Sequence, residues 1–334
     1  MRIIVFDVPA DGGGPLTILK KYYNDAIFDK ANEWIFIIST PKLEETNNVK
    51  IIRFPWVKKS WIHRLFFDAF ISPRLIEKYN ADEILSLQNI TVKSQLPQTL
   101  YIHQPLPFIE KRYKIWENPL FWFYQNPIGK KIYKSARLAN KIIVQTEWMK
   151  KATVEKAKVE STKIDIISPE LNLKIKQKFQ PNKKSMNTYF YPASAMVYKN
   201  HKVIVEAARL LKEQGITDIE VIFTLNGSEN RNIKKLYKQV LKSNLAIKFI
   251  GTIPYEKVLE YYSKSILLFP SYIETFGLPL IEARLHGAPI LASDTSFSRE
   301  ILNKYDKVNY FKYDNAYELA AYIKHFYILS KDYR

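Results

Sequence analysis

Two carboxylates eight positions apart, Glu274 and Glu282, carry the most specific chemical signal in this sequence. The segment between them includes Phe276-Gly277-Leu278-Pro279, and the apolar run Ile266–Phe269 before them predicts a buried strand. Proline suits the first turn of a helix, where its missing N–H costs nothing. The pattern therefore predicts Glu274 on a loop at the carboxyl end of a strand and Glu282 in the first turns of the next helix.

This position suits a ligand that has both hydroxyls and negative charge. Ligands of open α/β sheets bind at the carboxyl edge of the strands. A helix start offers N–H groups and a positive dipole end that favour phosphate. Two carboxylate acceptors beside an anion site fit a diphosphate with hydroxyls at both ends, as in a nucleotide sugar. A bare pair at this spacing is more often two solvated surface charges, but the strand and the intervening residues favour the specific interpretation.

The segment resembles the E-x7-E signature of retaining glycosyltransferases of the large family 4, which have the GT-B fold. The resemblance implies that Glu274 holds hydroxyls of the transferred sugar and that Glu282 holds the ribose hydroxyls. Backbone N–H groups near Phe276, Gly277 and Leu278 would then stabilise the leaving diphosphate. The resemblance covers most of the chain and extends to the segments described next.

The segment 191–201 is predicted to lie between a strand and a helix, with Asn200 suited to cap that helix. A lone lysine in such a place is usually a solvated charge. The segment, however, resembles the family region that supplies an arginine and, five positions later, a lysine to the diphosphate. Lys199 matches the lysine, whereas Ser194 stands at the arginine position, so one expected cation is absent.

Gly12, Gly13 and Gly14 follow the first predicted strand, and glycines let a backbone approach a ligand with no Cβ in the way. The string is neither G-x-G-x-x-G nor a P-loop, and in isolation it indicates a tight turn. The resemblance implies a glycine-rich loop here that approaches the donor phosphates.

His103 ends another first-half strand. A lone histidine is more often structural, but the family often has a histidine here that touches the transferred sugar or the acceptor.

Two further loops follow second-half strands. Asn226 and Gly227 end one of them, and Ile253 lies in the turn 251–254 after the next. The resemblance implies that backbone groups of the turn read the nucleotide base and that Asn226 lines the same pocket. An ordinary turn explains each loop equally well.

Length and composition limit the number of domains, the class of protein and its possible partners. The 334 residues favour two domains, and 47% hydrophobic residues exclude wholesale disorder. The absence of cysteine excludes disulfides and thiolate chemistry. The net charge of +18, from 51 basic and 33 acidic residues, indicates a polyanionic partner, and the lack of nucleic-acid motifs favours membrane and phosphate over DNA or RNA. Residues 1–7 are too short an apolar run for a signal peptide, so we expect a cytoplasmic protein.

Alternating strand and helix patterns predict an α/β fold with two parallel sheets. With the resemblance, this becomes GT-B: two Rossmann-like doubly wound domains facing across a cleft. We expect an acceptor domain over 1–172, a polar linker over 173–187, a nucleotide-sugar donor domain over 187–314, and a C-terminal helix over 315–334 that we interpret as a shortened crossover. The predicted strands are 3–8, 34–39, 50–54, 83–87, 99–103, 141–145, 187–191, 219–225, 246–250, 266–269, 290–293 and 308–311.

Aromatic and basic residues mix in segments 54–67 and 119–124. Such mixtures suit a membrane interface, where rings and cations both find partners. Aromatic rings also dominate protein cores, and that interpretation is equally good for these segments. We expect the protein to be peripheral at the inner face of the cell membrane, with an anionic surface and a glycan or lipid-linked acceptor as partners.

The sequence thus predicts a retaining, metal-independent hexosyltransferase of surface polysaccharide or lipopolysaccharide assembly, with Glu274, Lys199 and His103 at the reacting centre. No cofactor besides the nucleotide-sugar donor is expected, since no Asp-x-Asp metal motif stands out and GT-B enzymes generally need no bound metal. Three alternatives stay open: a nucleotide-sugar epimerase, a phosphorylase on the same fold, and an inactive membrane-associated scaffold that binds nucleotide sugars.

Overall fold

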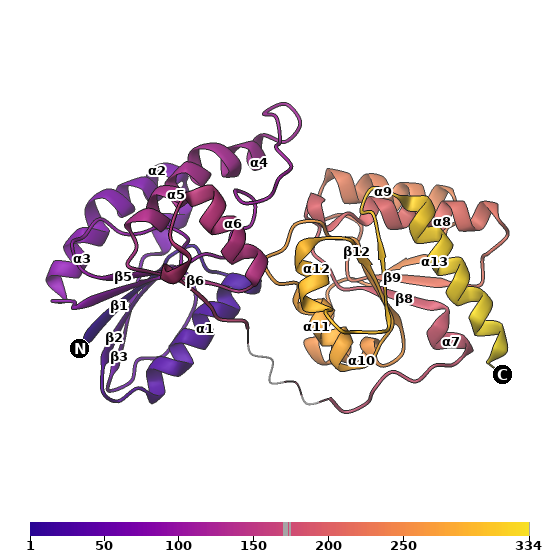
Figure 1. The fold of residues 1–334 in the computed structure, drawn as a ribbon, viewed down its shortest axis with the longest axis horizontal. Coiled ribbons are helices and arrows are strands. Elements are labelled where there is room, and N and C mark those ends of the chain that lie inside the picture. The colour runs from indigo at the N-terminus through magenta and orange to yellow at the C-terminus, as the bar shows by residue number, and fades with distance from the viewer. Residues whose placement is uncertain (170–172, 174, 334) are drawn as a thin grey trace. The chain divides into compact units, whose positions relative to one another are not determined.

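The computed structural model describes residues 1–169, 173 and 175–333. The chain forms two compact units, Met1–Glu170 and Leu171–Arg334 (Figure 1). The predicted boundary at residue 172, and residue 174 of the predicted linker, lie outside the described residues. Each unit is a parallel sheet with helices on both faces, which confirms the predicted α/β class.

The first unit is built on a seven-stranded sheet of order β3-β2-β1-β4-β5-β6-β7. Its strands are β1 (Arg2–Asp7), β2 (Glu33–Ile38), β3 (Val49–Arg53), β4 (Glu83–Ser86), β5 (Gln98–Tyr101), β6 (Lys141–Val144) and β7 (Ile164–Ile166). Its helices are α1 (Gly13–Phe28), α2 (Trp61–Phe66), α3 (Ser72–Lys78), α4 (Pro119–Phe123), α5 (Gly129–Leu138) and α6 (Glu147–Ala157). Short helical turns are η1 (Pro55–Lys59), η2 (Phe67–Ile71), η3 (Tyr124–Ile128) and η4 (Ser161–Lys163).

Side chains of the first sheet alternate between two covered faces, which is why its strands are apolar throughout. Val5 packs in the cluster that includes Leu19 of α1. Its neighbour Phe6 packs in the opposite cluster with Phe67 of η2 and Leu75 of α3. The same alternation determines on which side of the sheet each residue at the end of a strand lies.

The second unit is built on a six-stranded sheet of order β10-β9-β8-β11-β12-β13. Its strands are β8 (Thr188–Tyr191), β9 (Glu220–Phe223), β10 (Ile247–Phe249), β11 (Ile266–Phe269), β12 (Ile290–Ser293) and β13 (Val308–Phe311). Its helices are α7 (Lys183–Met186), α8 (His201–Glu213), α9 (Arg231–Lys242), α10 (Tyr255–Tyr262), α11 (Leu278–Leu285), α12 (Ser296–Ile301) and α13 (Ala316–Leu329), with turns η5 (Val197–Lys199) and η6 (Ser330–Asp332).

In both sheets the strand order reverses beside the first strand of the unit. β1 pairs with β2 and β4, and β8 pairs with β9 and β11. Such a reversal is a topological switch point, and the crevice outside the carboxyl ends of its strands is where doubly wound sheets bind ligands. The second switch point lies between the loops that carry Lys199 and Glu274.

Two sequence expectations need correction. The stretch 173–187 is not purely a linker, because α7 forms within it and Phe179 is buried, with its N–H donating to the carbonyl of His286 at 2.7 Å. The edge strand β7 was not predicted. Helix α13 covers the segment predicted to be helical and packs against α8 of its own unit. Within the described residues, no helix is long and apolar enough to cross a membrane.

Candidate functional site

Glu274 lies on the loop between β11 and α11, where the sequence predicts it. The loop is fixed at its start by Ser271, which is fully buried and whose hydroxyl donates to Glu274 Oε1 at 2.6 Å. It is also held to the η5 turn, since the N–H of Tyr272 donates to the carbonyl of Tyr198 at 3.2 Å. These bonds hold the Glu274 carboxylate at the carboxyl edge of the second sheet.

Lys199 and Glu274, 75 positions apart in the sequence, form an ion pair between Lys199 Nζ and Glu274 Oε1. Each side chain is only 16% exposed. Because β8 and β11 are neighbours in the sheet, the loops that follow them meet at one edge. The hydroxyl of Tyr191, on β8, donates to the carbonyl of Lys199 at 2.6 Å and fixes the turn that carries it.

The sequence also assigned roles to Asn200 and Ser194, which lie near Lys199 in the chain. Asn200 directly precedes α8 but does not cap it through its side chain, so that prediction is wrong. Its backbone is left-handed, with φ 58°, and its side-chain amide instead donates to the carbonyl of Tyr313 at 2.6 Å. Ser194 is exposed on the loop after β8.

Glu282 lies on α11 and is directed at α10. Its Oε1 accepts from the hydroxyl of Tyr255 at 2.7 Å, and its Oε2 accepts from the hydroxyl of Tyr262 at 2.9 Å. The side chain is 5% exposed, and this burial raises the pKa of the carboxyl against the opposing effect of the two tyrosine hydroxyls. Glu282 and Glu274 share no hydrogen-bond partner among these contacts.

Helix α11 begins within the Glu274–Glu282 segment, as the sequence predicts. Pro279 lies in the first turn, and no side chain caps the helix. Gly277 precedes it with φ 87°, a conformation that a residue with a Cβ rarely adopts. Phe276 is buried and Leu278 is half-buried, so the aromatic ring anchors the loop while the backbone forms the helix start.

The loops of Asn226 and Ile253 meet at the same edge. The N–H of Gly251 donates to the carbonyl of Leu225 at 2.9 Å, and a Cβ at Gly251 would lie 2.5 Å from Asn226 Oδ1. Ile253 is half-buried and stands two residues before Tyr255. The loop therefore adjoins the tyrosine that binds Glu282.

The three glycines of the first unit lie at the start of α1, with Gly12 directly before its first residue. Gly12 is extended and Gly13 has φ 59°, and a Cβ at Gly12, Gly13 or Gly14 would meet no atom within 4 Å. The loop therefore needs a glycine for conformation at Gly13, and its surroundings are open. Asp11, just before it, pairs with Lys58.

His103 is half-buried, two residues beyond the end of β5. Its backbone N–H donates to Asn89 Oδ1 at 2.7 Å, which sets the course of the loop. Its ring lies edge-on to Tyr101, with centroids 5.8 Å apart, and burial lowers the pKa of the imidazole to about 4. The ring is therefore neutral at pH 7 and suits hydrogen bonding better than strong base catalysis.

The mixed aromatic and basic segments divide between core and surface. Phe67 and Phe121 are buried, with 0% and 2% exposure, as the core interpretation predicts. Trp61 on α2 and Phe123 on α4 are exposed yet in ring contact, with centroids 6.1 Å apart. The other large exposed apolar side chains of this region are Ile62, Leu65, Phe66, Phe70, Ile115, Trp116 and Leu120.

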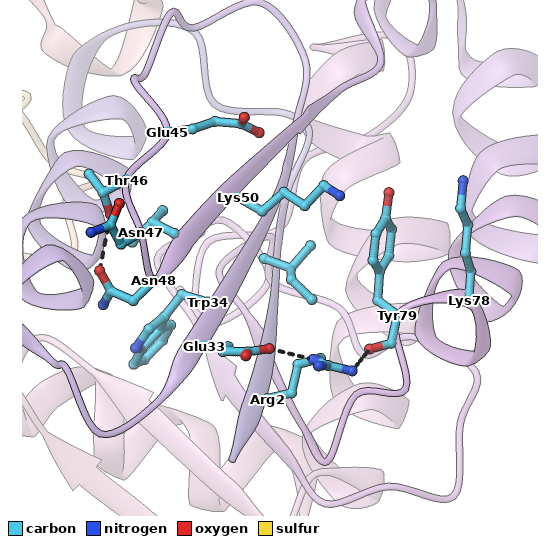
Figure 2. A pocket seen from close by; sticks show the side chains of 12 residues that line it. Arg2, Glu33, Trp34, Glu45, Thr46, Asn47, Asn48, Lys50, Lys78 and Tyr79 are labelled. Atoms are coloured by element: carbon cyan, nitrogen blue, oxygen red, sulfur yellow. Dashed lines mark hydrogen bonds and ion pairs between the residues drawn. The ribbon is translucent and has the colours of Figure 1, made fainter.

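A cavity of about 520 Å³ lies at the opposite, amino edge of the first sheet (Figure 2). Arg2 crosses its floor, with Nε 2.8 Å from Glu33 Oε2 and a guanidinium N–H donating to the carbonyl of Tyr79 at 2.9 Å. None of the predicted site residues lines it. Because doubly wound sheets bind ligands at the carboxyl edge, we do not assign this cavity to the site. Among the described residues, no cluster of three or more His, Asp or Glu side chains is arranged to hold a metal ion.

Sequence reasoning missed the groups that hold the two carboxylates. Tyr255 and Tyr262 lie seven positions apart, at helical spacing, on the element before the motif, and Ser271 stands three positions before Glu274. That spacing is visible in the sequence, but the tyrosines' partner on another helix is not. Glu229 was missed as well: its carboxylate accepts from the N–H groups of Asn226 and Gly227.

Comparisons with known proteins agree with this geometry. Residues 174–334 match the family described as glycosyl transferases group 1. The chain is 22% identical over 253 residues to the O-antigen chain mannosyltransferase RfbU of Salmonella typhimurium, covering 71% of this chain and 63% of that protein. It is 30% identical over 146 residues to the capsular polysaccharide biosynthesis glycosyltransferase CapH of Staphylococcus aureus, covering 41% of this chain and 37% of that protein.

Among solved structures, HepE of Anabaena in complex with UDP has a TM-score of 0.68 at 15% identity, covering 97% of this chain and 89% of that one. This likeness and the two parallel sheets confirm the predicted GT-B class of fold. The family match confirms the resemblance to group 1 glycosyltransferases. The chain spans less than two thirds of the length of the two curated relatives.

Proposed function

We propose that this chain is a retaining glycosyltransferase that moves a sugar from a nucleoside-diphosphate sugar to an acceptor hydroxyl. The observation that carries the proposal is the cluster of Lys199, Glu274 and Ser271 at the carboxyl edge beside the uncapped start of α11. A cation, a carboxylate and a helix N-terminus in one place supply charge stabilisation for a diphosphate and acceptors for sugar hydroxyls.

Binding of the donor would break the ion pair between Lys199 and Glu274 and give each of them a partner on the donor. A diphosphate carries more negative charge than one carboxylate, so it competes for Lys199 Nζ, and Glu274 is then available to sugar hydroxyls. As the glycosidic bond breaks, negative charge develops on the leaving oxygen, and Lys199 and the N–H groups at the start of α11 stabilise it. The open surroundings of Gly12, Gly13 and Gly14 in the first unit suit backbone contact with a phosphate group.

The nucleoside end is assigned to Glu282 and the loops beside it. Tyr255 joins Glu282 to the loop of Ile253, and that loop abuts Asn226. The ribose hydroxyls would bind Glu282 in place of, or together with, the hydroxyl of Tyr255, which lies on a side chain that is 48% exposed. The base would then lie against the loop of Ile253.

Retention of configuration needs no strong protein base in this scheme. The leaving phosphate accepts the proton of the acceptor hydroxyl on the same face of the sugar. His103 of the first unit, neutral at pH 7, suits a hydrogen bond to an acceptor. We expect the transfer to need no bound metal ion, because Lys199 and backbone dipoles hold the diphosphate. RfbU and CapH are described as O-antigen and capsular polysaccharide enzymes, which supports a glycan or lipid-linked glycan as acceptor.

We also propose that the exposed apolar residues of α2, η2 and α4 contact an anionic membrane. Trp61, Phe66 and Phe70 are each at least half exposed, and Trp116 is 76% exposed with Lys114 Nζ 5.3 Å from its ring centre. Rings flanked by cations suit the headgroup region of a bilayer. The net charge of +18 favours anionic lipid, so we expect a peripheral protein at the inner face of the membrane.

A thermal-shift screen with UDP, GDP, ADP, CDP, dTDP and their sugars tests the donor proposal, because a ligand that binds the native state raises its stability. We expect one nucleoside diphosphate to raise Tm. Turnover of its sugar with retained anomeric configuration by NMR would identify a retaining transferase. An inverted product would contradict retention, and a Tm unchanged by every nucleotide would contradict the donor site.

The same assays separate the alternatives. An epimerase would interconvert two nucleotide sugars without releasing nucleotide, and a phosphorylase would need inorganic phosphate. A scaffold would bind nucleotide without turnover, a result that the serine at position 194 in place of a cation would help to explain.

Vesicle flotation tests the membrane contact. We expect the unmodified chain to bind anionic vesicles and the double variant Phe66→Ser, Phe70→Ser to bind them more weakly. Phe28→Ser changes an exposed residue at the end of α1 and should bind as the unmodified chain does. Equal binding by both variants would contradict the assigned surface.

A further inference from the structure

Exposed basic residues lie along one side of helix α9 in the second unit. We call them the α9 stripe: Arg231, Lys234, Lys235, Lys238 and Lys242. An α-helix turns by about 100° per residue, so these five side chains lie within a sector about 100° wide. Ile233 and Val240, on the opposite side of the helix, are buried. The helix therefore packs on the unit through its apolar side and presents the stripe to solvent.

The stripe differs from the basic side chains of the adjacent helix α8, which packs against α9 (Figure 1). On α8, Lys202 Nζ lies 3.4 Å from Glu206 Oε1. Arg209 pairs with Glu213 one turn further along. Helix α9 contains no acidic residue, and among the described residues no ion pair involves the stripe. Its cations are therefore available to a partner of opposite charge.

The spacing within the stripe is unfavourable for the free helix. Like charges four positions apart destabilise a helix, and the stripe contains such pairs at 231 and 235, 234 and 238, and 238 and 242. An anionic partner relieves this repulsion. Neighbouring Cβ atoms at these spacings are about 5–6 Å apart, and the stripe extends about 16 Å along the helix axis. A linear chain with one anionic group on each short repeating unit matches this row of cations.

The narrowness of the stripe favours such a chain over a flat membrane. Because α8 adjoins α9, an anionic surface laid on both helices would also meet the carboxylates of Glu206 and Glu213. Leu241 is 61% exposed beside the stripe, but single exposed apolar residues are normal on protein surfaces. The mixture of rings and cations that suits a bilayer lies on the first unit instead.

The absence of rings from the stripe favours a glycan over a nucleic acid. Tyr237, the aromatic residue of α9, is half-buried and packs edge-on against Phe249, with ring centroids 4.9 Å apart. Proteins that bind single-stranded nucleic acid combine cations with rings on which the bases stack. Carboxylates on a sugar chain need only the cations, which bind them through charge-assisted hydrogen bonds.

We propose that the α9 stripe binds a linear acidic glycan whose sugars carry carboxylate groups. The stripe begins at the carboxyl edge of the second sheet, since the amide of Asn230, directly before Arg231, donates to the carbonyl of Ala195 in the loop after β8 at 2.8 Å. A chain on the stripe therefore extends from the edge that carries the candidate site. This inference rests on the proposed transferase function and narrows its glycan substrate to the acidic class.

Fluorescence anisotropy with labelled oligogalacturonate, a linear glycan with one carboxylate on each sugar, tests the proposal. Labelled maltooligosaccharide is the uncharged probe. The stripe variant combines Lys234→Gln, Lys235→Gln and Lys238→Gln. We expect the unmodified chain to bind oligogalacturonate but not maltooligosaccharide. The stripe variant should bind oligogalacturonate about tenfold more weakly, the effect of three lost ion pairs at an exposed surface.

The matched control combines Lys202→Gln, Arg209→Gln and Lys324→Gln, which removes the same charge from α8 and α13 of the same unit. It should bind oligogalacturonate as tightly as the unmodified chain. Equal losses in the two triple variants would show that net charge alone attracts the glycan, and would overturn the inference. Failure of the unmodified chain to bind oligogalacturonate, or equal binding of maltooligosaccharide, would overturn it as well.

Two further probes test the other anionic partners. If the stripe variant loses more affinity for oligothymidylate or for phosphatidylglycerol vesicles than for oligogalacturonate, the stripe serves nucleic acid or membrane and the inference is wrong. The nucleotide-induced rise in Tm, measured on the same samples, should be unchanged in both variants. A chain that binds nucleotide but no oligogalacturonate refutes only this inference. A chain that binds no nucleotide refutes the proposed function, whatever the glycan result.

Discussion

At the carboxyl edge of the second sheet most polar side chains of the candidate site bind one another, although Nε2 of the buried His201 has no partner, whereas at the carboxyl edge of the first sheet five residues have buried polar atoms without partners among the described residues. Lys199, Glu274 and Ser271 form one hydrogen-bonded group, and Glu282 accepts from two tyrosines. In the described part of the chain, Ser39, Gln88, His103 and Gln145 each have a buried side-chain atom without a hydrogen-bond partner, and Asp7 is fully buried with the backbone N–H of Ala10 beside its carboxyl. Both edges belong to parallel sheets with helices on both faces, so the difference lies in the side chains alone.

The difference has consequences for ligand binding and for stability. Groups that are already paired are held in place at little cost, but a ligand must displace their partners. Unpaired buried groups lower the stability of the free protein. The paired arrangement suits a charged diphosphate, which competes strongly for a lysine.

Replacing Lys199 with alanine should give the largest effect and tests the paired edge. Removing one group that stabilises a developing charge typically costs about 2.7–4 kcal/mol, so we expect Lys199→Ala to lower kcat about 10²–10³-fold. Lys202→Ala is the control, because Lys202 lies on the adjacent α8 with 72% of its side chain exposed. Steady-state rates with the donor found by the screen measure the effect. Unchanged turnover in a folded Lys199→Ala would remove the lysine from the mechanism.

The two tyrosines that bind Glu282 should differ in their contribution to stability. Tyr262 is fully buried, so Tyr262→Phe leaves a buried carboxylate oxygen without its donor, and we expect a loss of about 1.5–3 kcal/mol in the free energy of unfolding. Tyr255 is 48% exposed, so water replaces its hydroxyl and Tyr255→Phe should cost less. Urea unfolding measures both, and equal losses would show that burial does not set the strength of this pairing.

Asp7 gives the unpaired edge a dependence on pH. Burial raises the pKa of Asp7 in the folded state, against the opposing effects of a backbone hydrogen bond from Ala10 and of the charges of Arg64 and Lys58. The folded protein therefore holds the proton to higher pH than the unfolded chain, and this carboxyl lowers stability as pH rises above about 3.9, the unfolded value. Asp7→Asn should remove that slope and be more stable than the unmodified chain at pH 7. Urea unfolding between pH 4 and pH 8 measures it, and identical slopes would contradict a raised pKa.

Much of the fold could be predicted, because strands covered on both faces are continuous apolar runs. Ile266–Phe269 and Ile290–Ser293 were predicted with the limits they have, and the closing helix Ala316–Leu329 lies within the predicted range 315–334. The edge strand Ile164–Ile166 was missed because it has three residues, of which Ile164 alone is buried. The burial of Phe179 depends on a contact with His286, more than a hundred positions away, which no local pattern reveals.

The positions of the site residues at the ends of strands could be predicted from the local sequence pattern, but their side-chain partners could not. Lys199 was assigned to the diphosphate and Glu274 to the hydroxyls of the transferred sugar, but their direct pairing follows from the adjacency of β8 and β11. Asn200 was misassigned as a cap because its left-handed backbone directs the amide to Tyr313. Asp7 stands at the end of an apolar run in the sequence, but whether its carboxylate has a partner depends on every element around it.

Two serines provide the closest test of the comparison, and the smallest effect. Ser39 and Ser271 are both fully buried at carboxyl strand ends, but Ser39 has no partner and Ser271 donates to Glu274 at 2.6 Å. Ser271→Ala should lower the free energy of unfolding by about 0.5–1.5 kcal/mol. Ser39→Ala removes an unpaired hydroxyl, so it should leave stability unchanged or raise it. If both variants lose the same amount in urea unfolding, the Ser39 hydroxyl is paired in solution, and the first edge is no less satisfied than the second.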